Sequence, residues 1–77
     1  MKRASDFAAV VRLWPSLGAM ASDLQVEYDT VRKWKDRNNI PAWMWFEVLR
    51  AAKRRKINLD AVDLVILARD NAKQAAA

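Results

Sequence analysis

Residues 17–34 read LGAMASDLQVEYDTVRKW, and the pattern of this stretch decides the fold that we expect for the chain. Four apolar residues in its first half recur at positions i, i+3, i+4 and i+7, which is the spacing of one face of a short helix. They are Leu17, Met20, Ala21 and Leu24. Val31 and Trp34 begin a second stripe, and only residues 25–27 separate the two stripes. The sequence therefore predicts two short helices joined by a tight turn.

The second of these helices is dense in Lys and Arg. Two short amphipathic helices joined by about three residues, with a basic second helix, are typical of a helix-turn-helix motif. In such a motif the second helix enters the major groove of DNA. We place the motif over about residues 17–37.

The net charge of +5 is confined to one segment of the chain. Residues 27–56 hold nine Lys or Arg and four Asp or Glu, which accounts for the whole surplus, and the rest of the chain is balanced. A basic surplus in one segment favours a polyanionic partner such as a nucleic acid. An ordinary solvated basic face is the alternative interpretation.

Length and composition exclude several classes of protein. A chain of 77 residues is expected to form a single domain over 1–77 that buries roughly 60% of the surface exposed by its unfolded form. It contains no Cys and no His, which excludes a disulfide framework, ordinary zinc sites and a His-based catalytic triad. No catalytic pair of acids or Gly-rich phosphate loop is present, so we expect no enzyme, cofactor, metal or small-molecule substrate. No apolar run reaches about 18 residues, so we expect no membrane segment and a cytoplasmic, nucleoid-associated location.

Further helices are expected on either side of the motif. A helix over about 5–14 is indicated by Asp6 as N-cap and by Pro15 as the residue that ends it. Pro41 suits the first turn of another helix, where a missing N–H costs little. The inner face of that helix is expected to comprise Trp45, Val48, Leu49 and Ala52. No stretch has a strand pattern, so the predicted fold is all-α with five short helices.

The last helix, over about 60–74, is capped by Asp60 and is apolar almost all round near its start. A helix of that kind needs two neighbours. We therefore expect it to pack on its own core and on a second subunit. The predicted dimer interface comprises Leu64, Val65 and Leu67.

The aromatic residues divide into two groups. Three tryptophans fall on apolar stripes and are expected in the core, and these are Trp14, Trp34 and Trp45. Trp43 falls off the stripes and, with Met44, predicts an exposed apolar patch. Such a patch is more typical of a protein interface than of a stacking surface for single-stranded nucleic acid.

Residues 17–45, LGAMASDLQVEYDTVRKWKDRNNIPAWMW, resemble the Cro-type, lambda-repressor-like helix-turn-helix regulators of bacteria and their phages. Ala21 occupies the position of a small residue in that family's second helix, and Val26 that of the apolar residue after the turn. The tail IPAWMW resembles the opening of the fourth helix in a phage-borne subset. Gln25 departs from the pattern, since the family very often has Gly there to adopt left-handed dihedral angles.

The resemblance covers about residues 5–57 and implies a compact five-helix DNA-binding domain in which helices two and three form the helix-turn-helix. It implies a sequence-specific transcriptional regulator that binds double-stranded DNA. We expect a phage or prophage repressor that acts as a homodimer on an inverted-repeat operator, because one helix reads too few base pairs. The alternatives are a helix-turn-helix scaffold used as a protein-interaction module, an antitoxin, and a binder of single strands or RNA.

The second motif helix offers the candidates for reading DNA bases. With the apolar stripe turned inward, the opposite face is expected to carry Tyr28, Asp29, Arg32 and Lys33. Arg32 and Lys33 suit donation to guanine, with solvated charges or phosphate contacts as the alternative. Asp29 suits acceptance from cytosine N4 or capping of the helix. Tyr28 suits a thymine methyl group or a phosphate, with core packing as the alternative.

Another set is expected to contact the DNA backbone. The resemblance places phosphate contacts at the end of the second motif helix and in the loop after it, where they position the protein without reading sequence. The residues placed in this way are Lys35, Arg37, Asn38 and Asn39. Thr30 lies nearer the inner face of the helix and is a further candidate for a phosphate contact at most. The basic residues between Arg50 and Lys56 either extend this footprint or only cap the preceding helix.

Overall fold

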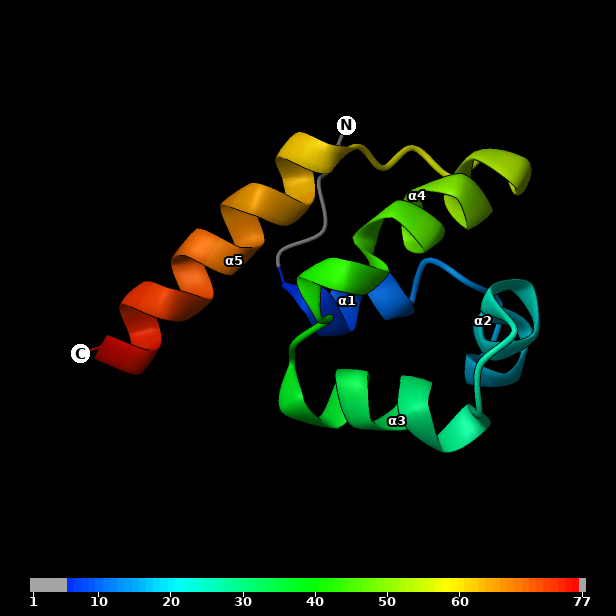
Figure 1. The fold of residues 1–77 in the computed structure, drawn as a ribbon, viewed down its shortest axis with the longest axis horizontal. Coiled ribbons are helices and arrows are strands. Elements are labelled where there is room, and N and C mark those ends of the chain that lie inside the picture. The colour runs from blue at the N-terminus through cyan, green and yellow to red at the C-terminus, as the bar shows by residue number, and fades with distance from the viewer. Residues whose placement is uncertain (1–5, 77) are drawn as a thin grey trace.

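The computed structural model describes residues 6–76, which form α-helices, one short 3-10 helix and no strand (Figure 1). The elements are α1 (Phe7–Val11), α2 (Leu17–Leu24), α3 (Tyr28–Arg37), the 3-10 helix η1 (Ala42–Met44), α4 (Trp45–Arg54) and α5 (Ala61–Ala76). For the described residues, this confirms the prediction of an all-α fold with five helices. None of the described helices is long and apolar enough to cross a lipid bilayer.

α1 is shorter than predicted. It begins after Asp6, whose carboxylate accepts a hydrogen bond of 2.7 Å from the backbone N–H of Ala9, as expected of an N-cap. It ends at Val11 rather than at residue 14, and single turns then carry the chain to Pro15. The predicted end was wrong because Trp14 leaves the helix to enter the core and donates its indole N–H to a carboxylate of α2. The predicted start at residue 5 lies outside the described residues.

The core gathers around α1, against which α3 packs (Figure 1). α2 contacts both α3 and α4, and α4 contacts α5. The largest side chains that are almost fully buried are Phe7, Met20, Ile40, Leu64, Val10, Val11, Val31 and Val48. Every helix therefore contributes to one apolar core, as a chain of this size requires.

The burial of the tryptophans agrees with the prediction, whereas the burial of the neighbouring Met44 does not. Trp14 and Trp34 are buried, and the half-buried Trp45 stacks on Phe7 with ring centroids 6.3 Å apart. The indole N–H of Trp45 donates to a backbone carbonyl oxygen at 2.8 Å. Met44 is buried, so the prediction of an exposed Trp43–Met44 patch was wrong in its second member.

Three helices end on a residue other than glycine with left-handed dihedral angles. These residues are Gln25 after α2, Asn38 after α3 and Lys56 after α4. At each end two consecutive backbone N–H groups turn back to carbonyl groups of the last helical turn, which is the Schellman arrangement. Each helix thus terminates cleanly, although the left-handed conformation costs an ordinary residue on the order of 1 kcal/mol.

α5 begins with a reciprocal cap. The backbone N–H of Asp63 donates to the Asp60 carboxylate at 3.1 Å, and the backbone N–H of Asp60 donates to the Asp63 carboxylate at 3.2 Å. This confirms Asp60 as the cap and agrees with the predicted helix to within about two residues at its C-terminal end. The first half of α5 packs on the core, whereas its C-terminal end extends away from the other helices (Figure 1).

Candidate nucleic-acid interface

Hydrogen bonds define both ends of α2, including the turn that joins it to α3. The hydroxyl of Ser16 accepts from the N–H of Ala19 at 3.0 Å, so Ser16 is the N-cap of α2. At the other end Gln25 has φ 57° and ψ 44°. The N–H of Val26 then donates to a carbonyl of α2 at 3.0 Å and closes the turn. Gln25 thus takes the conformation for which glycine is usual.

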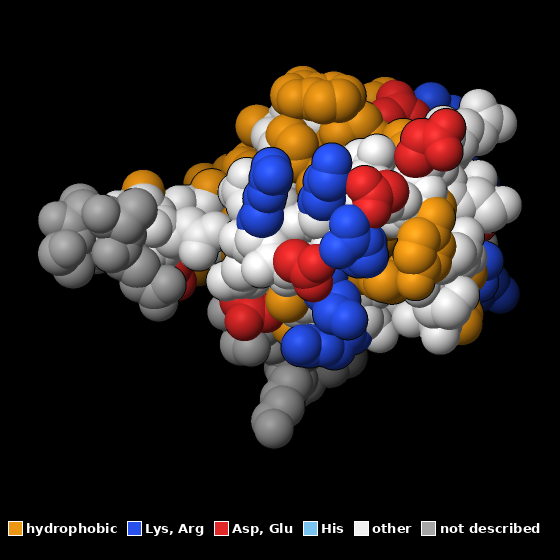
Figure 2. Space-filling model, turned by 90° about the horizontal axis from the view of Figure 1, so that it is seen from below, with side chains coloured by type: hydrophobic (Ala, Val, Ile, Leu, Met, Phe, Trp, Pro, Cys, Tyr) orange, Lys and Arg blue, Asp and Glu red, His pale blue; other side chains and the backbone are white. Residues whose placement is uncertain are grey.

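α3 crosses α2 steeply, since Figure 1 shows α2 almost along its axis and α3 lying across the view. Val31 and Trp34 bury the inner stripe of α3, as predicted, and α3 packs on α1 and α2. The outer side of α3 lies at the lower edge of the molecule. Figure 2 looks at this lower side and shows Lys and Arg side chains interspersed with Asp and Glu.

The structure brings all four predicted base-reading residues together on this exposed side. Tyr28 is 55% exposed, so the alternative of a core residue was wrong. Asp29, Arg32 and Lys33 are also exposed. They form one network, in which Arg32 Nε donates to Asp29 Oδ1 at 2.9 Å and Arg32 Nη1 donates to Asp36 Oδ2 at 3.0 Å.

Asp29 is the centre of this network. A second nitrogen of Arg32 also donates to its carboxylate, and Lys33 Nζ lies 3.4 Å from its other oxygen. Asp29 therefore interacts along α3, and Glu27 holds the N-cap position without a side-chain hydrogen bond. The hydrogen bonds from Arg32, and then from Lys33, lower the pKa of Asp29, while Asp29 raises the pKa of Arg32. Because these side chains are exposed, the pairs order the donors of Arg32 more than they stabilise the fold.

Four of the five predicted phosphate contacts lie in positions compatible with that role. Arg37 and Asn39 are exposed at the end of α3, and Thr30 and Lys35 are half-buried along it. Asn38 does not fit the role. Its side-chain oxygen accepts from the N–H of Ala8 in α1 at 2.9 Å, so Asn38 caps a neighbouring helix instead.

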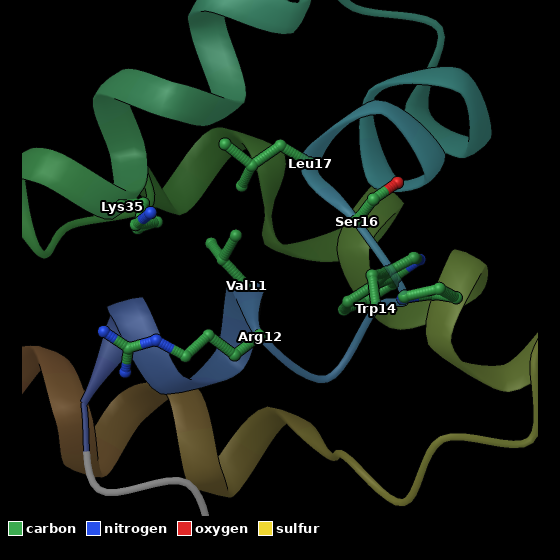
Figure 3. A pocket seen from close by; sticks show the side chains of 7 residues that line it. Val11, Arg12, Trp14, Ser16, Leu17 and Lys35 are labelled. Atoms are coloured by element: carbon green, nitrogen blue, oxygen red, sulfur yellow. The ribbon is translucent and has the colours of Figure 1, made fainter.

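A hollow beside α3 adds a cation that the sequence analysis missed. It has a volume of about 240 Å³ and lies between the end of α1, the start of α2 and α3. Figure 3 shows Arg12 and Lys35 on one side of it and Ser16, the cap of α2, on the other. Arg12 lies outside the helix-turn-helix pattern, and only its charge could have pointed to it. Two cations from separate elements therefore border this hollow.

The predicted dimer interface is corrected by the packing of α5. Leu64 and Leu67 are buried within their own chain, so they offer no surface to a second subunit. α5 docks on the core through Leu64 and Leu67, with Ala68 packed beside them, which leaves the third predicted residue outside. Val65 is 56% exposed, and Val62, one turn earlier, is 59% exposed.

No protein-family model, curated protein or solved structure matches the chain. Among the described residues, no group of three or more acidic side chains is placed to hold a metal ion. The geometry of α2, the turn and α3 therefore carries the functional interpretation.

Proposed function

We propose that this protein is a helix-turn-helix regulator of the Cro-type, lambda-repressor-like kind that binds double-stranded DNA sequence-specifically. The observation that supports the proposal is the joint arrangement of α2, the Gln25 turn and α3. One side of α3 is buried on α1 and α2, while the opposite side exposes the four predicted base-reading residues.

The dimensions of α3 suit a major groove. Ten residues make a helix about 15 Å long, and the groove is about 12 Å wide. Arg32 supplies the fork of donors that pairs with guanine O6 and N7, and Lys33 supplies a second cation. In the free protein Asp29 and Asp36 hold Arg32 in place. On DNA, guanine replaces one of these carboxylates as the acceptor, and the released Asp29 accepts from a cytosine amino group.

The surrounding cations position the helix on the DNA backbone. Arg12 and Lys35 beside the hollow, and Arg37 at the end of α3, contact phosphates and supply the salt-dependent part of the affinity. These contacts fix the register in which Arg32 and Lys33 meet the bases.

A homodimer completes the proposed regulator. A single α3 covers one half-site, and two copies related by a two-fold axis read half-sites about 34 Å apart. The exposed Val62 and Val65 of α5 provide the apolar contact for a second copy. Occupation of an inverted repeat within a phage or prophage promoter then excludes the polymerase and represses transcription.

The proposal is tested by selecting duplexes from a randomised pool with the full chain and measuring gel shifts on the selected DNA. We expect an inverted repeat with half-site centres about 10 base pairs apart. Its affinity should fall steeply between roughly 50 and 200 mM salt. Arg32→Ala should weaken binding to the selected site by about 5-fold to 150-fold, which corresponds to about 1–3 kcal/mol.

Arg50→Ala is the matched control, because it removes the same charge from the exposed side of α4. It should leave the preference for the selected site unchanged. Failure to enrich any duplex, or equal losses in the two variants, contradicts base reading by α3.

A further inference from the structure

The exposed side of α4 and η1 combines aromatic side chains with cations. It comprises Trp43, Phe46, Arg50, Lys53 and Arg54, and we call it the α4 face. The spacings of three and four residues place these side chains on one side of the helix. The opposite side is buried through Val48, Ala51 and Ala52. The α4 face is therefore an outer surface of the fold that the proposed DNA contacts do not use.

Its aromatic members are the most exposed large apolar side chains among the described residues. Trp43 is 78% exposed and Phe46 is 65% exposed. The packing of α4 on the core turns the ring of Phe46 outward. Two exposed aromatic side chains three residues apart are costly to maintain in water, and exposed apolar patches mark binding surfaces.

The cations of the α4 face border a groove. Phe46, Arg50, Lys53 and Arg54 line this groove along α4. Phe46 and Arg54 are eight residues apart, so the groove follows the helix for about 12 Å, or roughly two turns. The guanidinium carbon of Arg50 lies 5.6 Å from the centre of the Phe46 ring, within the range of a cation–π contact. The groove thus has an apolar end at Phe46 and a basic end toward Arg54, and Trp43 lies three residues before the apolar end.

Two of these cations have no carboxylate partner among the residues that the structure describes. In the described part of the structure no Asp or Glu forms an ion pair with Arg50 or Lys53. Arg54 donates to a backbone carbonyl oxygen of Asp23 at 3.2 Å, and the Asp23 carboxylate offsets part of its charge. Glu47 is the single acidic residue of α4. The α4 face accordingly has positive charge that a partner can neutralise.

We propose that the α4 face binds a partner protein through an acidic amphipathic helix of two to three turns. Apolar side chains of that helix pack on Trp43 and Phe46, and its carboxylates pair with Arg50, Lys53 and Arg54. The groove length, the separation of apolar and basic ends and the unneutralised charge match a helix-in-groove contact. Tryptophan and arginine are also the residues that most often dominate the binding energy of protein interfaces.

The aromatic geometry favours a protein over a single-stranded nucleic acid. Stacking of successive bases needs free ring faces. One face of Phe46 is occupied by the guanidinium of Arg50, so a base must displace this cation before it stacks there. An aliphatic side chain can instead pack against the ring edge of Phe46 and against Trp43 while the cation–π contact persists. A peptide helix is thus the better fit to the α4 face.

The test is a titration of the full chain, followed by ¹H–¹⁵N spectra, with a peptide of about 14 residues. The peptide is acetylated and amidated, with glutamates in its first half and leucines at i, i+3 and i+4 in its second half. We expect the amides of η1 and α4 and the indole N–H of Trp43 to shift, while those of α3 stay in place. A peptide of the same composition in scrambled order is the control for charge alone.

Two variants of the α4 face test which of its side chains contribute to peptide binding. Trp43→Ala and the double change Arg50→Glu with Lys53→Glu should each weaken peptide binding at least about tenfold. Lys33→Glu reverses a charge on α3 and is the matched control, which should change peptide binding less than about threefold. Circular dichroism checks that each variant remains folded, as expected for exposed positions.

Several results overturn the proposal. They are the absence of shifts at roughly millimolar peptide, equal binding of the scrambled peptide, and shifts centred on α3. Stronger binding of an oligothymidylate to the same amides assigns the α4 face to single-stranded nucleic acid instead. None of these outcomes depends on whether α3 reads DNA, since the measurement requires no duplex.

Discussion

α3 and α4 are both basic helices with one buried side, but Arg32 and Lys33 of α3 pair with carboxylates, whereas Arg50 and Lys53 of α4 form no ion pair with a described residue. Arg32 lies between two aspartates, whereas Arg50 lies over an aromatic ring. Paired cations have ordered donors and a reduced net field, which suits recognition of acceptors in fixed positions. Cations without acidic partners, next to exposed aromatic side chains, suit a partner that brings both negative charge and apolar surface. Net charge alone therefore does not distinguish the two helices, and the distinction lies in what surrounds each cation.

The largest expected effect is on the free energy of unfolding, and it distinguishes Trp34 of α3 from Trp43 at the start of α4. Trp34 is 6% exposed under α3, and Trp43 is 78% exposed at the start of α4. Trp34→Ala should lower the free energy of unfolding by about 3–5 kcal/mol, because it leaves a cavity in the core. Trp43→Ala should change it by less than about 0.5 kcal/mol. Urea unfolding followed by circular dichroism measures both values, and similar losses would contradict the assignment of Trp43 to a binding surface.

Removing two carboxylates from α3 should leave its cations without acidic partners, as is the case for Arg50 and Lys53 of α4 among the described residues. The double change Asp29→Asn with Asp36→Asn frees Arg32 and Lys33, so affinity for unrelated duplex DNA should rise about tenfold at low salt. The preference for the selected site should fall, since the donors of Arg32 are no longer held in place. Gel shifts on selected and unrelated duplexes measure both effects. Glu47→Gln removes an acid from α4 and serves as control, and an equal effect there would refute a special role for the α3 network.

The stabilisation that comes from the contact between Asp23 of α2 and Arg55 after α4 should depend on pH. Hydrogen bonds from Arg55 lower the pKa of Asp23, with a smaller contribution from the indole of Trp14. A lowered pKa means that ionised Asp23 stabilises the fold above about pH 4, and that this stabilisation is lost as pH falls through the folded pKa. Asp23→Asn should cost about 1 kcal/mol at neutral pH and weaken the acid dependence of stability.

Unfolding at pH 7 and at acidic pH measures this effect. Asp29→Asn is the comparison within α3, and its effect on stability should be smaller because its ion pairs are exposed. Identical pH profiles for the Asp23→Asn variant and the unmodified chain would show that Asp23 does not contribute.

The smallest expected effects concern the ends of the two helices. Lys56→Gly at the end of α4 should stabilise the fold by about 0.5–1 kcal/mol, because glycine adopts the left-handed conformation without strain. Asn38→Gly at the end of α3 relieves the same strain but removes the hydrogen bond to Ala8, so it should be neutral or destabilising by up to about 1 kcal/mol. Thermal unfolding of the two variants measures the difference, and equal stabilisation would show that the Asn38 cap contributes little.

Local chemistry made much of this fold predictable. The spacing of apolar residues located α2, α3 and α5, and the caps at Ser16 and Asp60 are properties of a few neighbouring residues. The inward positions of Val31 and Trp34 followed from the same periodicity, and with them the exposed side of α3.

Packing between distant segments was not predictable from such patterns. α5 is apolar on several sides, and only its docking decides that Leu64 and Leu67 face inward while Val65 faces water. In the same way the contact of Asn38 with α1 joins residues thirty positions apart. The partners of Arg32 along α3 were within reach of a sequence argument, since i, i+3 and i, i+4 spacings bring Asp29 and Asp36 beside it.

The amide of Asn71 in α5 donates to the backbone oxygen of Asn38 at 2.7 Å, and this contact has a mechanical consequence. It fastens the proposed dimer helix directly to the end of the proposed reading helix. In a dimer formed through α5, the separation of the two α3 helices is then set by α5 and its contact with α3 in each subunit, and not by a flexible linker. The two α3 helices of such a dimer are held at a fixed distance. Inserting one base pair between the half-sites therefore places the second α3 out of phase with its groove.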